Sequence, residues 1–144
     1  MSIQLRQICL VSSNLKKAED ELCSILGIEV CHRDPNVAQY GLENFLLPIG
    51  SNFIEVVAPS MGDTAAGRYF ERRKGDGGYM VITQVDSRAI QAEIRQRAEA
   101  KGIRVAHEVE REGWNFFQLH PGDMVASFLD IGWDEQENFE GHWY

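Results

Sequence analysis

The chain contains 144 residues, of which 44% are hydrophobic and 25% charged, a composition typical of one soluble globular domain. Its net charge of −8 would repel nucleic-acid phosphates, so we expect no nucleic-acid partner. No apolar run approaches the roughly 20 residues of a membrane-spanning helix, so we expect no membrane association. The first residues lack the features of a secretory signal, and the three cysteines show no C-x-x-C spacing, which predicts a cytoplasmic protein with reduced thiols.

The first half of the chain is predicted to form a strand, a helix and three further strands. Residues 5–11 are an apolar strand candidate, and Asn14 follows it with helix N-cap chemistry. Gly27 is placed where a helix would end. The helix between them has apolar residues at three- and four-residue spacings on one predicted face: Leu15, Ala18, Leu22, Ile25 and Leu26. The three strands that follow are predicted at 28–32, 37–47 and 53–58.

The second half repeats this order after a connecting helix. Residues 63–74 have helical spacing, and the glycine-rich stretch 75–78 ends them, so we expect the connection there. A strand at 79–85 precedes a helix that Ser87 would cap and Gly102 would end. Three more strands are predicted at 103–107, 114–120 and 125–132. The expected total is eight strands and three helices.

The two halves also match in their residues, at a constant offset of 75 positions. Residues 27–32 and 102–107 share the pattern Gly-Ile-x-Val-x-His, which places Gly27 against Gly102. Phe53-Ile54-Glu55-Val56 matches Phe128-Leu129-Asp130-Ile131, which places position 55 against position 130. Two conservative matches at one offset, inside the same order of elements, favour an internal duplication over the general similarity of amphipathic strands.

A duplicated unit of this kind has a helix for only one face of its strands, so the opposite faces are expected to enclose a cleft. Strand alternation places Phe53, Glu55 and Val57 on one face, and Phe128 and Asp130 on the corresponding face of the other half. If Glu55 and Asp130 face the cleft, they form a hard-cation site or a like-charge pair. The alternative is that both carboxylates point to solvent at strand ends.

The sequence resembles the vicinal oxygen chelate superfamily, the glyoxalase-like proteins, over nearly all of its length up to about Trp133. The likeness includes methylmalonyl-CoA epimerases and bleomycin-resistance proteins. It is carried by Gln7 to Val11 with Asn14 to Ala18, by Leu26-Gly27-Ile28, by 41–48 followed by 53–57, by 68–85, and by His120-Pro121-Gly122-Asp123.

That resemblance implies an α+β fold of two tandem βαβββ modules forming a curved mixed sheet around a cleft. The modules would span about 3–58 and 79–132 within a single domain at 1–133, followed by an acidic, aromatic tail at 134–144. It also implies a homodimer and a small-molecule ligand.

Members of the superfamily place four metal ligands on their inner strands, most often two histidines with Glu or Gln. At the matching positions this chain has Gln7 and Met80 in place of the histidines, together with Glu55 and Asp130. Oxygen donors from Gln7, Glu55 and Asp130 suit Mg²⁺ or Mn²⁺, whereas a Met thioether does not. The resemblance therefore implies a weakly bound divalent cation at these three residues or no cofactor at all.

The histidines and Cys9 are the other side chains that could act as a base, a ligand or a nucleophile. His32 and His107 occupy equivalent repeat positions, where a structural role is expected, and His120 lies in a turn that suggests packing or a backbone hydrogen bond. Cys9 shares a strand face with Gln7 and would be a nucleophile only with a base beside it, so a buried, small side chain is the preferred interpretation.

Two functions of different classes remain open. The first is an isomerase or lyase acting on a small carbonyl or thioester compound, in which Glu55 or Asp130 removes a proton next to the carbonyl. The second is a metal-free binding protein that sequesters a small molecule, as bleomycin-resistance proteins do. Either would use a mostly apolar cleft, whose expected ligand-binding residues are Gln7, Asn44, Phe53, Met80 and Phe128. The alternative for the aromatic residues is that they form ordinary core.

Overall fold

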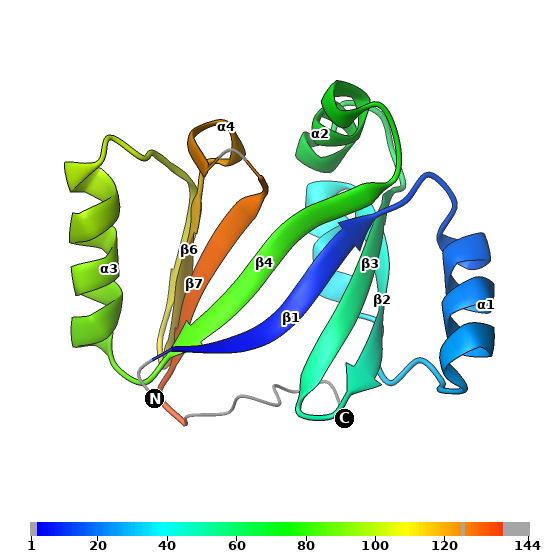
Figure 1. Ribbon diagram of the computed structural model, residues 1–144, viewed down its shortest axis with the longest axis horizontal. Coiled ribbons are helices and arrows are strands. Elements are labelled where there is room, and N and C mark those ends of the chain that lie inside the picture. Colours follow the sequence, from blue (N-terminus) through cyan, green and yellow to red (C-terminus); the bar gives the residue numbers. More distant parts are fainter. Residues whose placement is uncertain (1–2, 125, 137–144) are drawn as a thin grey trace. The chain divides into compact units, whose positions relative to one another are not determined.

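The computed structural model describes residues 3–124 and 126–136, which contain seven β-strands, four α-helices and one 3₁₀ helix (Figure 1). The strands are β1 (Ile3–Val11), β2 (Leu42–Ile49), β3 (Asn52–Pro59), β4 (Gly77–Val85), β5 (Val105–Arg111), β6 (Trp114–Leu119) and β7 (Phe128–Asp134). The helices are α1 (Leu15–Leu26), η1 (Pro35–Tyr40), α2 (Ala65–Arg73), α3 (Arg88–Ala100) and α4 (Pro121–Met124). None of the helices in the described part of the chain is long and apolar enough to cross a membrane.

The strands form one mixed, open sheet with the order β2-β3-β1-β4-β7-β6-β5. β2 pairs antiparallel with β3, and β6 pairs antiparallel with both β5 and β7. β4 and β7 are parallel, and α3, β5, β6 and α4 lie between them in the chain. This arrangement confirms the predicted α+β class with a mixed sheet.

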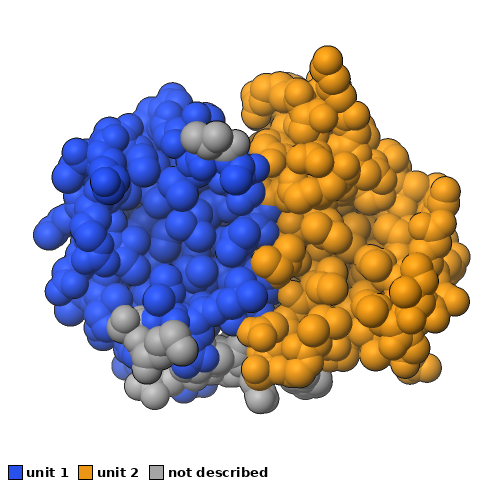
Figure 2. Space-filling model, viewed as in Figure 1, with its two compact units in different colours: residues 1–7, 80–139 blue, residues 8–79, 140–144 orange. Residues whose placement is uncertain are grey.

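The described residues fall into two compact units, shown in Figure 2 in orange and blue. The first unit contains residues 8–79, and the second contains 3–7, 80–124 and 126–136. The expectation of a single domain over 1–133 stays a prediction. Of the predicted tail, Asp134 ends β7 and residues 137–144 lie outside the described residues.

The core of the first unit forms between α1 and the strands β2 and β3, which lie side by side in Figure 1. Asn14 caps the helix by accepting a hydrogen bond from the Lys17 N–H, and Gly27 ends it in the left-handed conformation. Leu15, Ala18 and Leu22 then pack against a buried core of Phe45, Leu47 and Val56. Ile25 and Leu26 do not belong to this face as predicted, because their side chains are 77% and 44% exposed.

The core of the second unit forms in the same way between α3 and the strands β4, β6 and β7. Ser87 caps α3 through the Ile90 N–H, as the sequence predicted. Ile90, Ile94 and Ala98 of the helix pack with buried apolar side chains from the strands, namely Val85, Phe117, Leu119 and Ile131.

Four predicted strands differ clearly from the observed elements, and one of them, predicted at 103–107, is shifted to Val105–Arg111. The segment 28–32 makes only an isolated bridge from His32 to Leu46, so seven strands are present among the described residues in place of eight. The strand predicted at 37–47 begins as η1, because Asp34 and Pro35 supply the cap and first residue of a helical turn. The strand predicted at 125–132 is shifted to Phe128–Asp134, after the short helix α4.

Candidate functional site

Glu55 lies on the face of β3 that is turned away from α1. Its neighbours Ile54 and Val56 pack into the core beneath that helix, and strand alternation directs Glu55 to the opposite face. The residue is nevertheless only 8% exposed. A carboxyl group at this depth requires hydrogen-bonding partners, since burying an unpaired charge is costly. The alternative of a solvent-facing Glu55 at a strand end is therefore wrong.

Asn44 on the adjacent strand β2 supplies one of these partners. Its Nδ2 donates a hydrogen bond to Glu55 Oε1 at 2.7 Å, and both residues are buried. The Asn44 Oδ1 accepts a bond from the Asp34 backbone N–H at 2.9 Å, which fixes which end of the amide faces the carboxylate. Asn44 was predicted as a ligand-binding residue, and the structure brings it directly against the predicted catalytic carboxylate.

A thiol and a phenol also lie near Glu55 within this unit. Burial raises the pKa of the Cys9 thiol well above its ordinary value, and the adjacent Glu55 carboxylate raises it further. Burial also raises the pKa of Tyr79, with further contributions from Cys9, Glu55 and Tyr69. The Tyr79 ring packs against the Tyr69 ring, with their centroids 5.2 Å apart. Both Cys9 and Tyr79 therefore hold their protons near neutral pH, which agrees with Cys9 as a buried small side chain.

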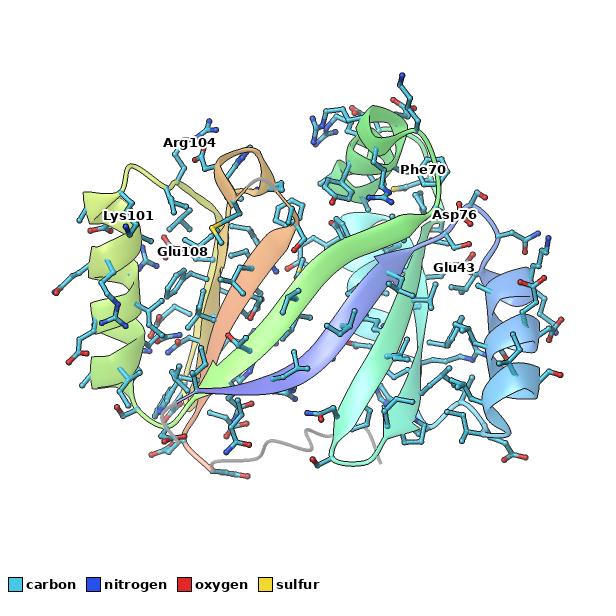
Figure 3. All side chains as sticks on the ribbon, viewed as in Figure 1. Glu43, Phe70, Asp76, Lys101, Arg104 and Glu108 are labelled. Atoms are coloured by element: carbon cyan, nitrogen blue, oxygen red, sulfur yellow. The ribbon has the colours of Figure 1, made fainter. Side chains whose placement is uncertain are left out.

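The start of β4, and with it Tyr79, is held in place by the turn before it. Asp76, which Figure 3 labels in this turn, accepts hydrogen bonds from the Ser13 backbone N–H at 2.9 Å and from the Ser12 hydroxyl at 3.0 Å. Arg73 at the end of α2 donates to the backbone carbonyls of Gly75, Asp76 and Gly78. These contacts fasten the strand that carries Tyr79 to the end of β1, the strand that carries Cys9.

Asp130 occupies the corresponding place in the second unit. Its neighbours Leu129 and Ile131 pack beneath α3, so Asp130 faces away from that helix, and it is 5% exposed. Gln118 lies directly opposite on β6, and its Nε2 donates to Asp130 Oδ2 at 3.1 Å. As for Glu55, burial contradicts a solvent-facing position.

A buried arginine lies near Asp130. Burial lowers the pKa of Arg6, while the negative charges of Asp134 and Asp130 oppose that shift. The Arg6 Nη1 donates to Gln84 Oε1 at 2.9 Å, and Gln84 is 1% exposed. Asp130 therefore belongs to a buried group that already contains a cation.

The remaining predicted site residues are divided between the two units. Phe53 is 1% exposed in the first unit, on the same strand face as Glu55. Met80 and Phe128 are register partners on β4 and β7 of the second unit, which also contains the buried Gln7. The predicted set Gln7, Glu55 and Asp130 thus draws on both units, and its shared role as a site stays a prediction.

A separate groove of 450 Å³ lies in the second unit between α3 and the strands β5 and β6. Ion pairs line it, Arg88 with Glu110 and Arg95 with Glu108, and Glu108 is labelled in Figure 3. The Arg95 guanidinium also lies 4.6 Å from the centre of the Phe117 ring. The groove contains neither Glu55 nor Asp130, and its charges are already paired.

Residues 8–141 match the family model described as the glyoxalase-like domain. The chain belongs to this family. The glyoxalase-like chain is also similar in fold to a hypothetical protein from Bacillus halodurans C-125, with 19% identity, a TM-score of 0.76 and coverage of 93% and 96% of the two chains. No curated protein matches it by sequence.

Methylmalonyl-CoA epimerases are among the other solved structures that share the fold. The enzyme from Mycobacterium tuberculosis is 17% identical, with a TM-score of 0.72 and coverage of 90% of this chain and 87% of that one. A Streptomyces coelicolor variant in complex with 2-nitronate-propionyl-CoA is 21% identical, with a TM-score of 0.75 and coverage of 93% and 96%. These likenesses confirm the predicted resemblance and the fold.

Both carboxylates have neighbours that are not metal ligands. Asn44 presents an N–H hydrogen to Glu55, and the cation Arg6 lies near Asp130. Each of these groups meets part of the hydrogen-bonding or charge requirement of a buried carboxylate. Among residues 3–124 and 126–136, no three His, Cys, Asp or Glu side chains are grouped so that they could hold a metal. The Mg²⁺ or Mn²⁺ site stays a prediction, and no chemical step below depends on it.

Sequence reasoning missed Arg6, Tyr79, Gln84 and Gln118 as members of these groups. One signal was present: Arg6 is the charged residue within the apolar-rich strand predicted at 5–11. The histidine interpretations fare better, because His120 Nδ1 accepts a hydrogen bond from the Gly122 N–H at 3.0 Å, as its place in a turn predicted.

Proposed function

We propose that this glyoxalase-like protein is an enzyme that removes a proton from a carbon next to a carbonyl or thioester group, with Glu55 as the general base. The observation that carries the proposal is the buried Asn44–Glu55 pair, whose 2.7 Å hydrogen bond holds one carboxylate oxygen in a fixed position. A base that is already oriented loses little freedom when it meets the substrate, which favours proton transfer.

Asp130 is the less suitable base of the two predicted carboxylates. Its buried neighbour Arg6 stabilises the ionised form and lowers the tendency of Asp130 to accept a proton. The neighbours of Glu55 within the unit include an amide, a thiol and a phenol. These groups can donate hydrogen bonds without adding a full positive charge.

The substrate class follows from the reaction and from the fold. A carboxylate base can remove a proton only where the resulting carbanion is delocalised onto an oxygen, as in ketones and thioesters. Similar structures include a methylmalonyl-CoA epimerase in complex with methylmalonyl-CoA, whose acyl group is such a thioester. We propose an isomerase or lyase of this general kind, in a cytoplasmic homodimer.

Solvent exchange at the acidic carbon tests the proposal without knowledge of the final product. The purified protein is incubated in D₂O with α-hydroxy ketones, N-acetylcysteamine thioesters of 2-methyl acids, and methylmalonyl-CoA, and loss of the C–H signal is followed by NMR. We expect Glu55→Gln to slow the exchange by about 10²- to 10⁴-fold. Glu43→Gln is the matched control, since Glu43 is exposed on β2 beside Asn44 (Figure 3) and should leave the rate unchanged.

Exchange by Glu55→Gln within threefold of the wild-type rate would contradict the assignment of the base. An absence of exchange for every compound, together with a ligand-dependent rise in melting temperature, would favour the metal-free binding protein of bleomycin-resistance type.

A further inference from the structure

The groove between α3 and the strands β5 and β6 is a cavity apart from the surroundings of Glu55. All of its lining residues belong to the second unit. Its volume of 450 Å³ lies within the range of about 300–1,000 Å³ that is usual for small-molecule sites. On the helix side it is lined in part by the exposed, small side chains of Ala89 and Ala92, which leave the groove open.

Two buried amide side chains also line this groove. Gln91 of α3 is 7% exposed, and its Nε2 donates a hydrogen bond to the Ile131 carbonyl at 2.9 Å. Asn115 of β6 is 2% exposed, and its Nδ2 donates to Glu110 Oε1 at 3.5 Å. Within the described part of the chain, neither amide oxygen accepts a hydrogen bond, and neither is sealed from solvent. Since buried polar atoms are generally hydrogen-bonded, both oxygens are suited to accept from a molecule in the groove.

The charged side chains of the groove favour a neutral ligand. Arg88 pairs with Glu110 and Arg95 pairs with Glu108, so these four charges sum to zero. The Arg95 guanidinium is also held against the Phe117 ring, 4.6 Å from its centre. An anionic ligand would meet the two glutamates, and a cationic one would meet the two arginines.

We propose that this groove binds a neutral polyol, such as a monosaccharide. A hydroxyl group both donates and accepts hydrogen bonds, so neighbouring hydroxyls can donate to the oxygens of Gln91 and Asn115 and accept from the arginines while the ion pairs persist. The site contains neither Glu55 nor Asp130. Failure of the proposed proton-transfer function would therefore leave this proposal intact.

The test is an NMR titration of the full ¹⁵N-labelled chain at neutral pH with D-glucose, D-ribose and sorbitol. The side-chain amide signals of Gln91 and Asn115 report directly on the two oxygens. We expect both signals to shift saturably with at least one of these polyols. Gluconate and N-methylglucamine carry a similar row of hydroxyls with one negative or one positive charge, and each should bind at least about fivefold more weakly than sorbitol.

Two variants with matched controls locate the site. Ala92→Leu fills the groove from an exposed helix position and should weaken polyol binding by at least about tenfold, whereas Gln96→Leu on α3 lies outside the lining and should not. Asn115→Ala should weaken binding about 2- to 10-fold through loss of one hydrogen bond. Its control is Gln118→Ala, which alters the opposite face of β6 and should leave the affinity unchanged.

An absence of saturable shifts with all three polyols would overturn the proposal. Equal binding of gluconate and sorbitol would overturn the choice of a neutral ligand. If Asn115→Ala does not fold, Ala92→Leu keeps both amides and decides alone: affinity equal to that of Gln96→Leu would show that the polyol binds elsewhere.

Discussion

The two units place a buried carboxylate at equivalent positions but surround it with different chemistry. Glu55 on β3 and Asp130 on β7 are 75 residues apart, and each accepts a hydrogen bond from an amide on the adjacent antiparallel strand. Glu55 is accompanied by a thiol and a phenol, whereas Asp130 is accompanied by the guanidinium of Arg6. The two strands therefore place a carboxylate at the same position, but the side chains around it differ between the units.

That difference separates a chemical role from a structural one. A carboxylate beside a buried cation is held in its ionised form and contributes to stability, while one beside neutral donors keeps the ability to take up a proton. Under the proposed function, catalysis belongs to Glu55 in the first unit, and we propose that Asp130 balances a buried charge in the second.

Loss of the buried cation should have the largest effect on stability. Arg6→Met leaves Asp130 and Asp134 buried without their nearby cation, and breaking such a group costs about 3–5 kcal/mol in the free energy of unfolding. Urea denaturation measures this cost. Arg88→Met is the control, because the Arg88 side chain is 50% exposed in its pair with Glu110 and such pairs contribute about 1 kcal/mol or less.

The double variant Arg6→Met with Asp130→Asn should regain part of that loss, because it removes one of the unbalanced charges together with the cation. If Arg6→Met were no more destabilising than Arg88→Met, Asp130 would have no need of the cation. The structural role assigned to it would then be wrong.

Loss of either amide side chain, Asn44 or Gln118, should cost less stability than loss of Arg6, and the loss of Asn44 should cost more than that of Gln118. Asn44→Ala removes the partner of both the Glu55 carboxylate and the Asp34 N–H at a buried position, which should cost about 1–3 kcal/mol. Gln118→Ala removes a single 3.1 Å bond at a half-buried position that water can reach, and should cost about 1 kcal/mol or less. Urea midpoints measured side by side give the order, and a larger loss for Gln118→Ala would contradict it.

Much of the fold could be predicted because its local signals agree with its packing. The caps Asn14 and Ser87 begin α1 and α3 as expected. Strand alternation correctly placed Glu55 and Asp130 on the faces opposite their apolar neighbours, which pack beneath the helices. The strand predicted at 28–32 was wrong because apolar residues alone do not ensure hydrogen bonding to a neighbouring strand. Only the single bridge from His32 to Leu46 forms there.

The composition of the site was less predictable, because it depends on contacts between distant parts of the chain. Arg6 and Gln84 are 78 residues apart, and Gln118 meets Asp130 only in the particular register of β6 and β7. Strand alternation predicts the face of a side chain but not its neighbour on the next strand. Asn44 and Glu55 were both expected in the site, yet their mutual hydrogen bond required the β2–β3 pairing to be known.

The smallest effects are expected at the aspartates that fasten one turn in each unit, and they appear only in acid. Burial tends to raise the pKa of Asp76, but hydrogen bonds from the Ser13 N–H and the Ser12 hydroxyl outweigh it and hold that pKa below its ordinary value. The side chain and backbone N–H of Arg104, labelled in Figure 3, hold the pKa of Asp123 further below it. An aspartate whose pKa is lowered by folding stabilises the protein at pH values above its unfolded-state pKa, which is near 4. This stabilisation is lost as the pH falls toward the folded-state pKa. Melting temperatures should therefore fall less steeply below about pH 4 in Asp123→Asn than in the wild type, with a weaker change in Asp76→Asn. A steeper fall in Asp123→Asn than in the wild type would contradict the prediction for Asp123. The reverse order of the two aspartates would show that the turn of the first unit is the more strongly fastened of the two.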